Sequence, residues 1–533
     1  MSTENASRDF TGEFRLDVED FGPIGKASVD LRPLTVFIGP SNTGKSYLAT
    51  LIYALHQAFG GGKKRPYGDR LLSLILDSFI DSQSTKAKDD ILELYSDWLL
   101  RRNNGNSQDT PQGDPTLQPD FPMQVDSRIR TVFEQVDAFG NYISGKITGY
   151  FGFGAEETAL LVRRSRDVSG ARIELSIPRL AGDGIVGYSI RINEEGVRFS
   201  GHVGGAELVV NEIERSAALR DTPLDLRYLR RSARLNVDDD EDLMFSLTRI
   251  MDAVFKELTS PINRNAFYLP ADRTGAMQSH KSVVRALIES APFRTSSLTA
   301  GSPLFSGVLG DFLSELIGLN PIRTGDRTKS RHVPARLGDK LATDLEHGVL
   351  EGTVRMEDAG SGYPKFEYRP HGWDRSLSLV QASSMVAELA PVVIYLRHLL
   401  RPDDVLIIEE PESNLHPAMQ VEFTRQLAGL VRAGIRVIVT THSEWVLQEL
   451  ANLVRVAELP EAKRQGIAGG DMALNASQVG AWFFQPDAHG GGSTVSEIGL
   501  DEESGLYPTD FEDVARAMHN DWAEIFSRLG EVE

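Results

Sequence analysis

The sequence contains no cysteine, so disulfide bonds, thiolate zinc sites and cysteine nucleophiles are excluded together. It also lacks a hydrophobic run long enough to cross a bilayer, because its most apolar stretch, residues 385–400, is interrupted by Glu388, Pro391 and Arg397. The first ten residues have neither the basic segment nor the apolar segment of a secretory signal. We therefore expect a soluble, cytoplasmic protein without a membrane partner.

Positive charge is also scarce. The chain has 56 lysines and arginines against 76 aspartates and glutamates, which gives a formal net charge of −20. This balance disfavours a surface that coats nucleic acid, although it leaves room for a local basic groove. With 533 residues, 41% of them hydrophobic and 25% charged, the chain is long enough for roughly two to four ordinary globular units.

Apolar strands alternate with amphipathic helices along much of the chain. The apolar, β-rich runs that are typical of buried strands lie at 34–38, 267–269, 405–408 and 435–439. The helical spacing of apolar residues recurs at 46–55, 383–400 and 419–430. This order predicts an α/β fold with a largely parallel sheet, whose ligands bind at the carboxyl ends of the strands.

A glycine-rich loop joins the first of these strands to a helix. It follows the pattern G-x-x-x-x-G-K-S, and its residues, with the tyrosine that comes next, are Gly39, Pro40, Ser41, Asn42, Thr43, Gly44, Lys45, Ser46 and Tyr47. In such a loop the backbone N–H groups surround phosphates, the lysine reaches the β- and γ-phosphates, and the serine hydroxyl binds Mg²⁺. The loop therefore predicts a triphosphate site that depends on Lys45 and Ser46.

Acidic and imidazole side chains follow two other strands. Glu409 and Glu410 close the strand at 405–408, and His442 follows the strand at 435–439. A carboxylate at such a strand end can hold Mg²⁺ through water while its neighbour polarises an attacking water molecule. Since the carboxyl ends of parallel strands meet at one edge of the sheet, His442 is expected to contact the γ-phosphate.

Two serines begin the helix at 383–400. Ser383 and Ser384 would place hydroxyl groups and N–H groups at a helix N-terminus, where anions bind readily. Alone, this pattern is more typical of an ordinary serine N-cap. The other motifs make an anion site the preferred interpretation.

Together these motifs resemble those of ABC-type ATPases in kind and in order. The segments concerned are the glycine-rich loop at 39–46, the serine pair at 383–384, VLIIEEPESNLHP at 405–417 and TTHSEW at 440–445. They are similar to the soluble branch of SMC-like, RecF-like and OLD-family ATPases. Residues 34–55 and the element YLPADR at 268–273 resemble the "AAA fifteen/twenty-one" type. The resemblance extends over about residues 12–60 and 262–450.

The resemblance implies an ABC-type P-loop ATPase head with a mixed α+β insertion and a small C-terminal extension. The expected divisions are 1–83 for the first part of the head, 84–261 for the insertion, 262–455 for the second part of the head and 456–533 for the extension. In the extension, Trp482, Phe483 and Phe484 are expected to be core residues rather than a partner-binding patch. A closing helix is expected from Asp510.

The resemblance also implies roles around ATP and Mg²⁺. Lys45 and Ser46 would bind the triphosphate and the metal, and Glu409 would support the metal. Glu410 would be the general base, with His442 as the switch histidine.

Other residues would act across an interface between two heads. Asn414 lies in a segment, 413–416, that resembles the D-loop, which crosses that interface. Ser383 and Ser384 resemble the signature serines, which contact the γ-phosphate bound by the opposite protomer. The implied assembly is a homodimer, or a higher homo-oligomer, that closes on ATP and opens after hydrolysis.

Three features depart from the family pattern. Met385 stands where a glycine usually follows the paired serines, and its side chain could hold the backbone away from the γ-phosphate and slow hydrolysis. Glu409 replaces the commoner aspartate, which lengthens the reach to the metal by one methylene. The Q-loop glutamine of the family is not marked by a motif here, and Gln278 is the candidate for it.

The leading hypothesis is an ATPase that acts as the sensor or motor subunit of a multi-chain system. Stand-alone ATPases of this kind resemble the ATPase components of antiphage defence operons, in which the partner is a nuclease or a toxin. The tail beyond His442 has no D-x-D sequence and no Toprim-like acidic cluster, so no nuclease is expected in this chain.

Two alternatives stay open. A DNA-repair or recombination ATPase would use basic stripes, and the candidate residues are Arg163, Arg164, Arg166, Arg227, Arg230, Arg231 and Arg234. The acidic surroundings favour a solvated face over a DNA site for these arginines. A scaffold that binds ATP with little turnover is the second alternative, and Met385 is the reason to consider it.

Overall fold

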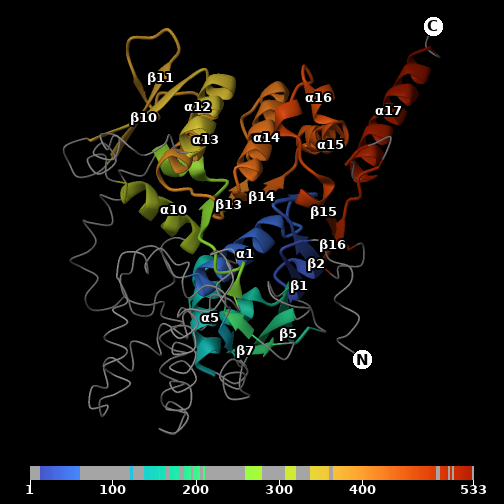
Figure 1. Ribbon diagram of the computed structural model, residues 1–533. Helices are drawn as coiled ribbons and strands as arrows, with labels where there is room; N and C mark the ends of the chain where they lie inside the picture. The colour runs from blue at the N-terminus through green and yellow to red at the C-terminus, as the bar shows by residue number, and fades with distance from the viewer. Residues whose placement is uncertain are drawn as a thin grey trace, which may run out of the picture.

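The structure is a computed structural model, and it is described here for residues 12–60, 121–123, 137–154, 157–163, 168–178, 185–193, 196–203, 208–210, 259–278, 306–319, 337–358, 364–487, 492–501, 505–506 and 509–530. Its centre is a mixed sheet with the strand order β7-β6-β5-β1-β2-β16-β15-β3-β14-β13-β9 (Figure 1). Helices cover this sheet on both faces. The α/β class expected from the sequence is confirmed.

The parallel part of the sheet carries the strands that end in the predicted motifs. Its members are β15 (Val479–Pro486), β3 (Leu34–Ile38), β14 (Arg436–Thr441), β13 (Val405–Glu409) and β9 (Ala266–Leu269). The register pairs Glu409 with Thr440 and Thr441 with Ile38. The carboxyl ends of β3, β14 and β13 therefore lie together at one edge, as the alternation of strands and helices predicted.

Two hydrophobic cores lie on opposite faces of this sheet. Along β3, Phe37 belongs to one core and its neighbours Val36 and Ile38 to the other, because successive strand residues point to opposite faces. The first core includes α1 (Lys45–Phe59) and α5 (Asp137–Tyr150). The second includes α12 (Leu337–Leu345), α13 (Ser384–His398), α14 (Pro417–Arg432) and α15 (Glu444–Glu458). Burial on both faces explains why these strands read as continuous apolar runs.

An antiparallel wing continues the sheet beyond the parallel strands. It consists of β1 (Phe14–Phe21), β2 (Ile24–Leu31), β5 (Gly170–Pro178), β6 (Ile185–Asn193) and β7 (Gly196–Val203). β5 pairs with β1, so part of the expected insertion extends the same sheet that carries the glycine-rich loop. The expected domain boundaries themselves stay a prediction.

A carboxylate joins this region to the first helix of the head. Asp311 lies on α10 (Gly307–Ile317), and its Oδ2 accepts hydrogen bonds from Tyr53 on α1, at 3.0 Å, and from Tyr150 on α5, at 2.9 Å. Three helices from distant parts of the sequence are therefore fixed to one another.

Smaller elements surround these layers. They are β4 (Phe121–Met123), β8 (Leu208–Val210), η4 (Glu346–Leu350), β10 (Gly352–Asp358), β11 (Pro364–Pro370), β12 (Leu377–Ser378), α16 (Glu461–Arg464), β16 (Ser493–Glu497) and α17 (Thr509–Gly530). Within the described ranges, no helix combines the length and the apolarity that a membrane span requires.

The C-terminal extension contributes a strand to the middle of the sheet. β15 pairs with β3 on one side and with β16 on the other. Trp482, Phe483 and Phe484 are buried there, which confirms that they are core residues. The ring of Phe484 packs edge-on against Phe37 of β3, with 5.5 Å between the ring centroids. The extension therefore supports the strand that leads into the glycine-rich loop.

The last helix, α17, projects away from the sheet (Figure 1). It presents Met518, Trp522, Ile525 and Phe526 with 68%, 66%, 55% and 69% of their surface exposed. Their spacing of three or four residues places these side chains on one face of the helix. A contiguous apolar face of this kind is typical of an interaction surface.

Deletion of residues 508–533 is expected to lower the solution mass of the assembled protein and to leave nucleotide affinity unchanged. α17 lies outside the sheet that carries the glycine-rich loop, and its exposed face is of the kind that a partner covers. Light scattering would give the mass and a fluorescence titration the affinity. The pair Met518→Ser and Trp522→Ser should reproduce the effect, whereas Ser527→Ala on the same helix should not. An unchanged oligomer after the deletion would contradict this prediction.

Candidate functional site

The glycine-rich loop joins β3 to α1 and has no room for side chains at its two glycines. A Cβ atom at Gly39 would lie 2.4 Å from the carbonyl oxygen of Phe484, and one at Gly44 would lie 2.6 Å from Cγ1 of Ile24. Both glycines have positive φ angles, of 142° and 99°. Asn42 also has a positive φ, of 65°. The backbone therefore follows a tight path at these positions, as a cradle for phosphates requires.

Lys45 begins α1, and its side chain folds back over the loop. Its Nζ donates hydrogen bonds to the carbonyl oxygens of Gly39, at 2.8 Å, and of Pro40, at 2.7 Å. Burial lowers the pKa of Lys45 to about 8, and the carboxylates of Glu410 and Glu412 oppose this shift. The ammonium group is therefore charged at neutral pH but loses its charge not far above it.

Two hydroxyl groups brace the loop. Thr43 Oγ1 donates a hydrogen bond to the carbonyl oxygen of Pro40 at 2.8 Å. Ser493, at the start of β16, donates its hydroxyl to the carbonyl oxygen of Thr43 and its N–H to that of Pro23, the latter at 2.9 Å. The loop is thus held partly by the C-terminal extension.

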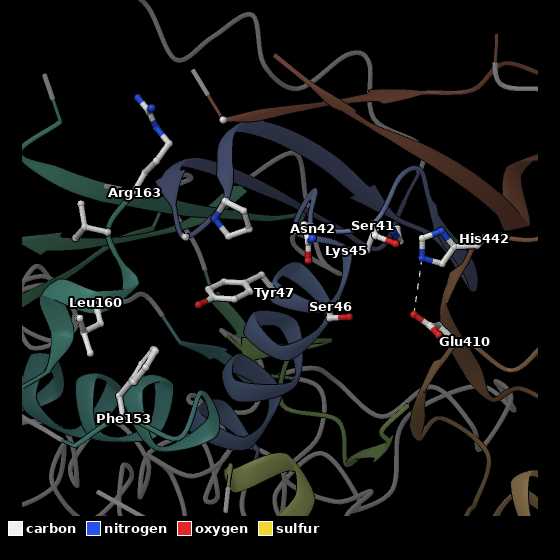
Figure 2. Close-up of a pocket in the computed structure, with 15 residues that line it drawn as sticks. Ser41, Asn42, Lys45, Ser46, Tyr47, Phe153, Leu160, Arg163, Glu410 and His442 are labelled. Carbon is white, nitrogen blue, oxygen red and sulfur yellow. Dashed lines mark ion pairs between the residues drawn. The ribbon is translucent and has the colours of Figure 1, made fainter. Parts of the chain in front are cut away.

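Glu410 and His442 meet where β13 and β14 end (Figure 2). Nε2 of His442 lies 3.7 Å from Oε1 of Glu410. The backbone of Glu410 has a φ of 42°, and its N–H donates to the carbonyl oxygen of Thr440 at 2.8 Å. Burial and the charge of Lys45 lower the pKa of His442, so its imidazole is neutral at pH 7. A neutral imidazole beside a carboxylate can take part in proton transfer.

One cavity of about 800 Å³ joins these groups. The predicted residues that line it are Ser41, Asn42, Gly44, Lys45, Ser46, Tyr47, Glu410 and His442. Gly39, Pro40 and Thr43 complete the loop without lining the cavity. Figure 2 shows Ser46 and the Glu410–His442 pair on one side and Tyr47, Leu160 and Phe153 on the other. The cavity therefore has a polar end and an apolar end.

The apolar end was not predicted from the sequence. Its residues include Tyr47, Phe153 and Leu160, and the cavity is also lined by Gly22, Pro23, Val162, Arg163 and Gly492. The ring of Tyr47 packs against Phe151, with 4.7 Å between the ring centroids. Apart from Tyr47, Gly22 and Pro23, these residues are far from the loop in the sequence, and no motif marks them as part of a nucleotide site.

Arg163, from the first of the two candidate stripes, has a carboxylate partner. Its Nε donates to Oδ1 of Asp20 at 2.7 Å, and Arg163 also lines the cavity. The other arginines of the two stripes lie outside the described residues, namely Arg164, Arg166, Arg227, Arg230, Arg231 and Arg234.

Glu409 does not line the cavity. Its residue is 8% exposed, and its Oε2 accepts a hydrogen bond from the N–H of Ala271 at 3.0 Å. Among the described residues, no group of three or more histidine, aspartate or glutamate side chains could hold a metal ion. Mg²⁺ needs no such group, because it commonly takes one or two protein ligands together with phosphate oxygens and water. Ser46 fits that requirement, and the metal-supporting role of Glu409 stays a prediction.

The predicted serine pair lies outside the cavity of its own chain. Ser383 and Ser384 are exposed where α13 begins, and Ser383 Oγ accepts a hydrogen bond from the N–H of Val386 at 3.3 Å. Met385 packs partly against the second core. The two serines rather than the methionine are therefore the more exposed residues at this helix terminus.

Two further predicted positions are also absent from the cavity lining. Asn414 is exposed in a turn and has a positive φ of 64°. Gln278 is exposed in the segment that follows β9.

Residues 330–447 match the model of a family described as AAA ATPase domain. The match covers less than half of the chain. It includes Ser383, Ser384, Glu409, Glu410 and His442 and leaves out the glycine-rich loop. No curated protein matches the chain.

Three solved structures of SMC heads are similar to the chain at low TM-scores. The first, an SMC head bound to the C-winged helix domain of ScpA, is 12% identical, with 92% of this chain and 98% of that chain covered and a TM-score of 0.37. The SMC head domain from Thermotoga maritima is 11% identical, with 91% and 98% covered and a TM-score of 0.35. An Smc head with an extended coiled coil, bound to the C-terminal domain of ScpA derived from Pyrococcus furiosus, is 11% identical, with 95% and 98% covered and a TM-score of 0.37. Similarity at this level leaves substrate and partner to be inferred from the site.

Affinity for a nucleoside triphosphate is expected to weaken as the pH rises through the pKa of Lys45, which is about 8. The charged ammonium attracts phosphate, and above this pKa the free protein must first take up a proton. From pH 7 to pH 9 the Kd should rise about tenfold, in line with the charged fraction of Lys45. Because His442 is already neutral over this range, it adds no slope. Binding by Lys45→Arg, which keeps its charge, should not depend on pH, and a flat wild-type profile would contradict the assignment.

Proposed function

We propose that the chain is an ATPase that binds ATP and Mg²⁺ in the described cavity. One observation carries the proposal: the lysine of a glycine-rich loop shares this cavity with a carboxylate and a neutral imidazole at adjacent strand ends. A loop alone would indicate phosphate binding. The added Glu410–His442 pair supports hydrolysis, because it places a proton acceptor beside the phosphate cradle.

The two ends of the cavity suit the two ends of the nucleotide. The loop and Lys45 would hold the phosphates, and the apolar end with Tyr47 and Phe153 would hold the base. Mg²⁺, when bound, would neutralise charge on the β- and γ-phosphates, with Ser46 as its protein ligand. The match of residues 330–447 to an ATPase family supports the same nucleotide chemistry.

In this proposal, hydrolysis is direct attack of water on the γ-phosphorus. Glu410 would accept a proton from the water as its oxygen forms the new bond to phosphorus and the bond to the ADP oxygen breaks. His442 would hydrogen-bond to the γ-phosphate and orient Glu410, from which it is 3.7 Å away. Lys45 would offset the negative charge on the phosphate oxygens.

The proposed active unit has two chains. Ser383 and Ser384 are exposed outside the cavity of their own chain, so they are available to a nucleotide bound by a second copy. Large apolar side chains are exposed close to them in the sequence, with Trp373 at 57% and Val380 at 59%. Trp445 is 43% exposed three residues after His442. Such surfaces support closure of one head on another around ATP.

The wider role proposed is that of a sensor or motor subunit in a multi-chain system, with an effector such as a nuclease or a toxin as its partner. The resemblance to antiphage defence ATPases suggests this role. DNA binding would use the two candidate arginine stripes, of which the structure describes Arg163, paired with Asp20. A scaffold with little turnover has less support, because Met385 packs partly against the core.

Substitution Glu410→Gln should lower phosphate release by at least about 100-fold and leave ATP affinity nearly unchanged, because it removes the general base and keeps the shape. The variant should also accumulate as a dimer of double mass when ATP and Mg²⁺ are present. Glu458→Gln serves as the control, since that carboxylate is exposed at the far end of α15. Unchanged phosphate release in Glu410→Gln would refute the general-base role.

A further inference from the structure

Arg273 is the largest fully buried side chain in the described part of the protein, and its residue is 0% exposed. It lies four residues after β9 ends, next to the end of β13. The mechanism proposed above does not use it. A buried guanidinium is costly unless its charge and its five N–H donors have partners, so the identity of these partners indicates its purpose.

One set of partners belongs to the segment that carries the general base. Arg273 donates to the carbonyl oxygen of Glu409 at 2.5 Å through Nη1 and to that of Glu410 at 3.3 Å through Nη2. Nη1 also donates to the carbonyl oxygen of Pro270 at 3.0 Å. The guanidinium therefore holds the backbone of Glu409 and Glu410 in place.

The second set belongs to α13, the helix that begins with the serine pair. Nε of Arg273 donates to the carbonyl oxygen of Glu388 at 3.1 Å, and its Nη2 forms an ion pair with the Glu388 carboxylate. The hydroxyl of Thr274 donates to the same carboxylate. Glu388 is 1% exposed and lies about one helical turn beyond Ser384. Burial lowers the pKa of Arg273 and raises that of Glu388, and each charge opposes the other's shift.

The backbone of Glu410 needs such support. Its φ of 42° lies in the left-handed region, which is unfavourable for a residue with a side chain. Its N–H is held by the carbonyl oxygen of Thr440 at 2.8 Å, and its carbonyl oxygen accepts from Arg273. A small shift of α13 would therefore be transmitted through Arg273 to the carbonyl side of the general base.

We infer that Arg273, with Glu388, is a positioning device that couples the N-terminus of α13 to the general base Glu410. The inference rests on the proposed function, in which Ser383 and Ser384 contact the nucleotide of a second copy. When Ser383 and Ser384 of one chain contact the nucleotide of a second copy, the resulting shift of α13 would change the position of Glu410 in the first chain. Nucleotide bound to one chain would therefore control the rate of hydrolysis in the cavity of the other. Arg273 is buried and does not line the cavity, so it would act through Glu410.

A second buried ion pair on α13 provides a matched control for the Arg273–Glu388 pair. Arg397, near the end of α13, donates to both carboxylate oxygens of Glu346, at 2.8 and 2.5 Å, and Glu346 is 3% exposed. Glu346→Gln therefore weakens a buried ion pair of the same kind, on the same helix, without touching the base. Glu388→Gln keeps the size of the side chain, removes its charge and replaces one acceptor oxygen with an NH₂ donor.

The test measures kcat, KM and ATP affinity for wild type, Glu388→Gln, Arg273→Lys and Glu346→Gln. Glu388→Gln and Arg273→Lys are expected to lower kcat about tenfold and to change ATP affinity less than about twofold, because displacement of a catalytic group affects turnover more than binding. Lysine keeps the charge but cannot reach both sets of partners, so it should not rescue kcat. Glu346→Gln should lower thermal stability with kcat unchanged.

Thr274→Val covers the case in which Glu388→Gln does not fold. It removes one hydrogen bond to Glu388 without leaving a lone buried charge, and it should lower kcat about threefold.

A second readout separates this inference from the proposed function. Hydrogen exchange of the amides in residues 408–416 should quicken in Glu388→Gln and not in Glu346→Gln, whether or not the protein hydrolyses ATP. If the wild type shows no turnover but the exchange pattern holds, the proposed function fails and the coupling stands. Equal kcat and equal exchange in Glu388→Gln and Glu346→Gln would overturn the coupling.

Discussion

The parallel register of β3, β14 and β13 is the constraint on which the rest of the site depends. Because Thr441 pairs with Ile38 and Glu409 with Thr440, three strand ends open at the same edge of the sheet. The glycine-rich loop, Glu410 and His442 each follow directly from one of these ends. A shift of one residue in either pairing would turn the side chains to the opposite face and move the groups apart. The chemistry proposed for the cavity thus depends on the pairing of these three strands.

Side chains and strands from distant segments hold this edge in place. The carbonyl oxygen of Phe484, on β15, leaves no space for a Cβ atom at Gly39, so the C-terminal extension helps to shape the loop. Arg273 donates hydrogen bonds to a carbonyl oxygen at the end of β13 and to one in α13, and so connects that strand end to the helix. The cavity therefore depends on the head and the extension together. We expect substitutions in the head or in the extension to alter the conformation of the glycine-rich loop.

The sequence predicted those parts of the site that local patterns determine. The glycine-rich loop, the buried strands and the residues at their ends are contiguous motifs, and the structure brings Lys45, Glu410 and His442 together. Strand order was less accessible, because β5 beside β1 and β15 beside β3 are long-range pairings without a local signal. The apolar end of the cavity escaped prediction for the same reason. Arg273 stood in a recognised segment, YLPADR, but the partner that explains it is 115 residues away.

The most direct test of the central claim uses the absence of native cysteine. One protomer would carry Ser41→Cys and a second would carry Ser384→Cys, each with a different affinity tag. Both would also carry Glu410→Gln to prevent hydrolysis. A short crosslinker that reacts with two thiols would then be added. Ser41 lines the cavity and Ser384 is exposed at the start of α13, so a crosslink between the two tagged chains reports closure of one head on the nucleotide of the other. Crosslinked heterodimer is expected with ATP and Mg²⁺ and not without nucleotide. Equal yields with and without ATP, or no crosslink under either condition, would contradict a nucleotide shared between two heads.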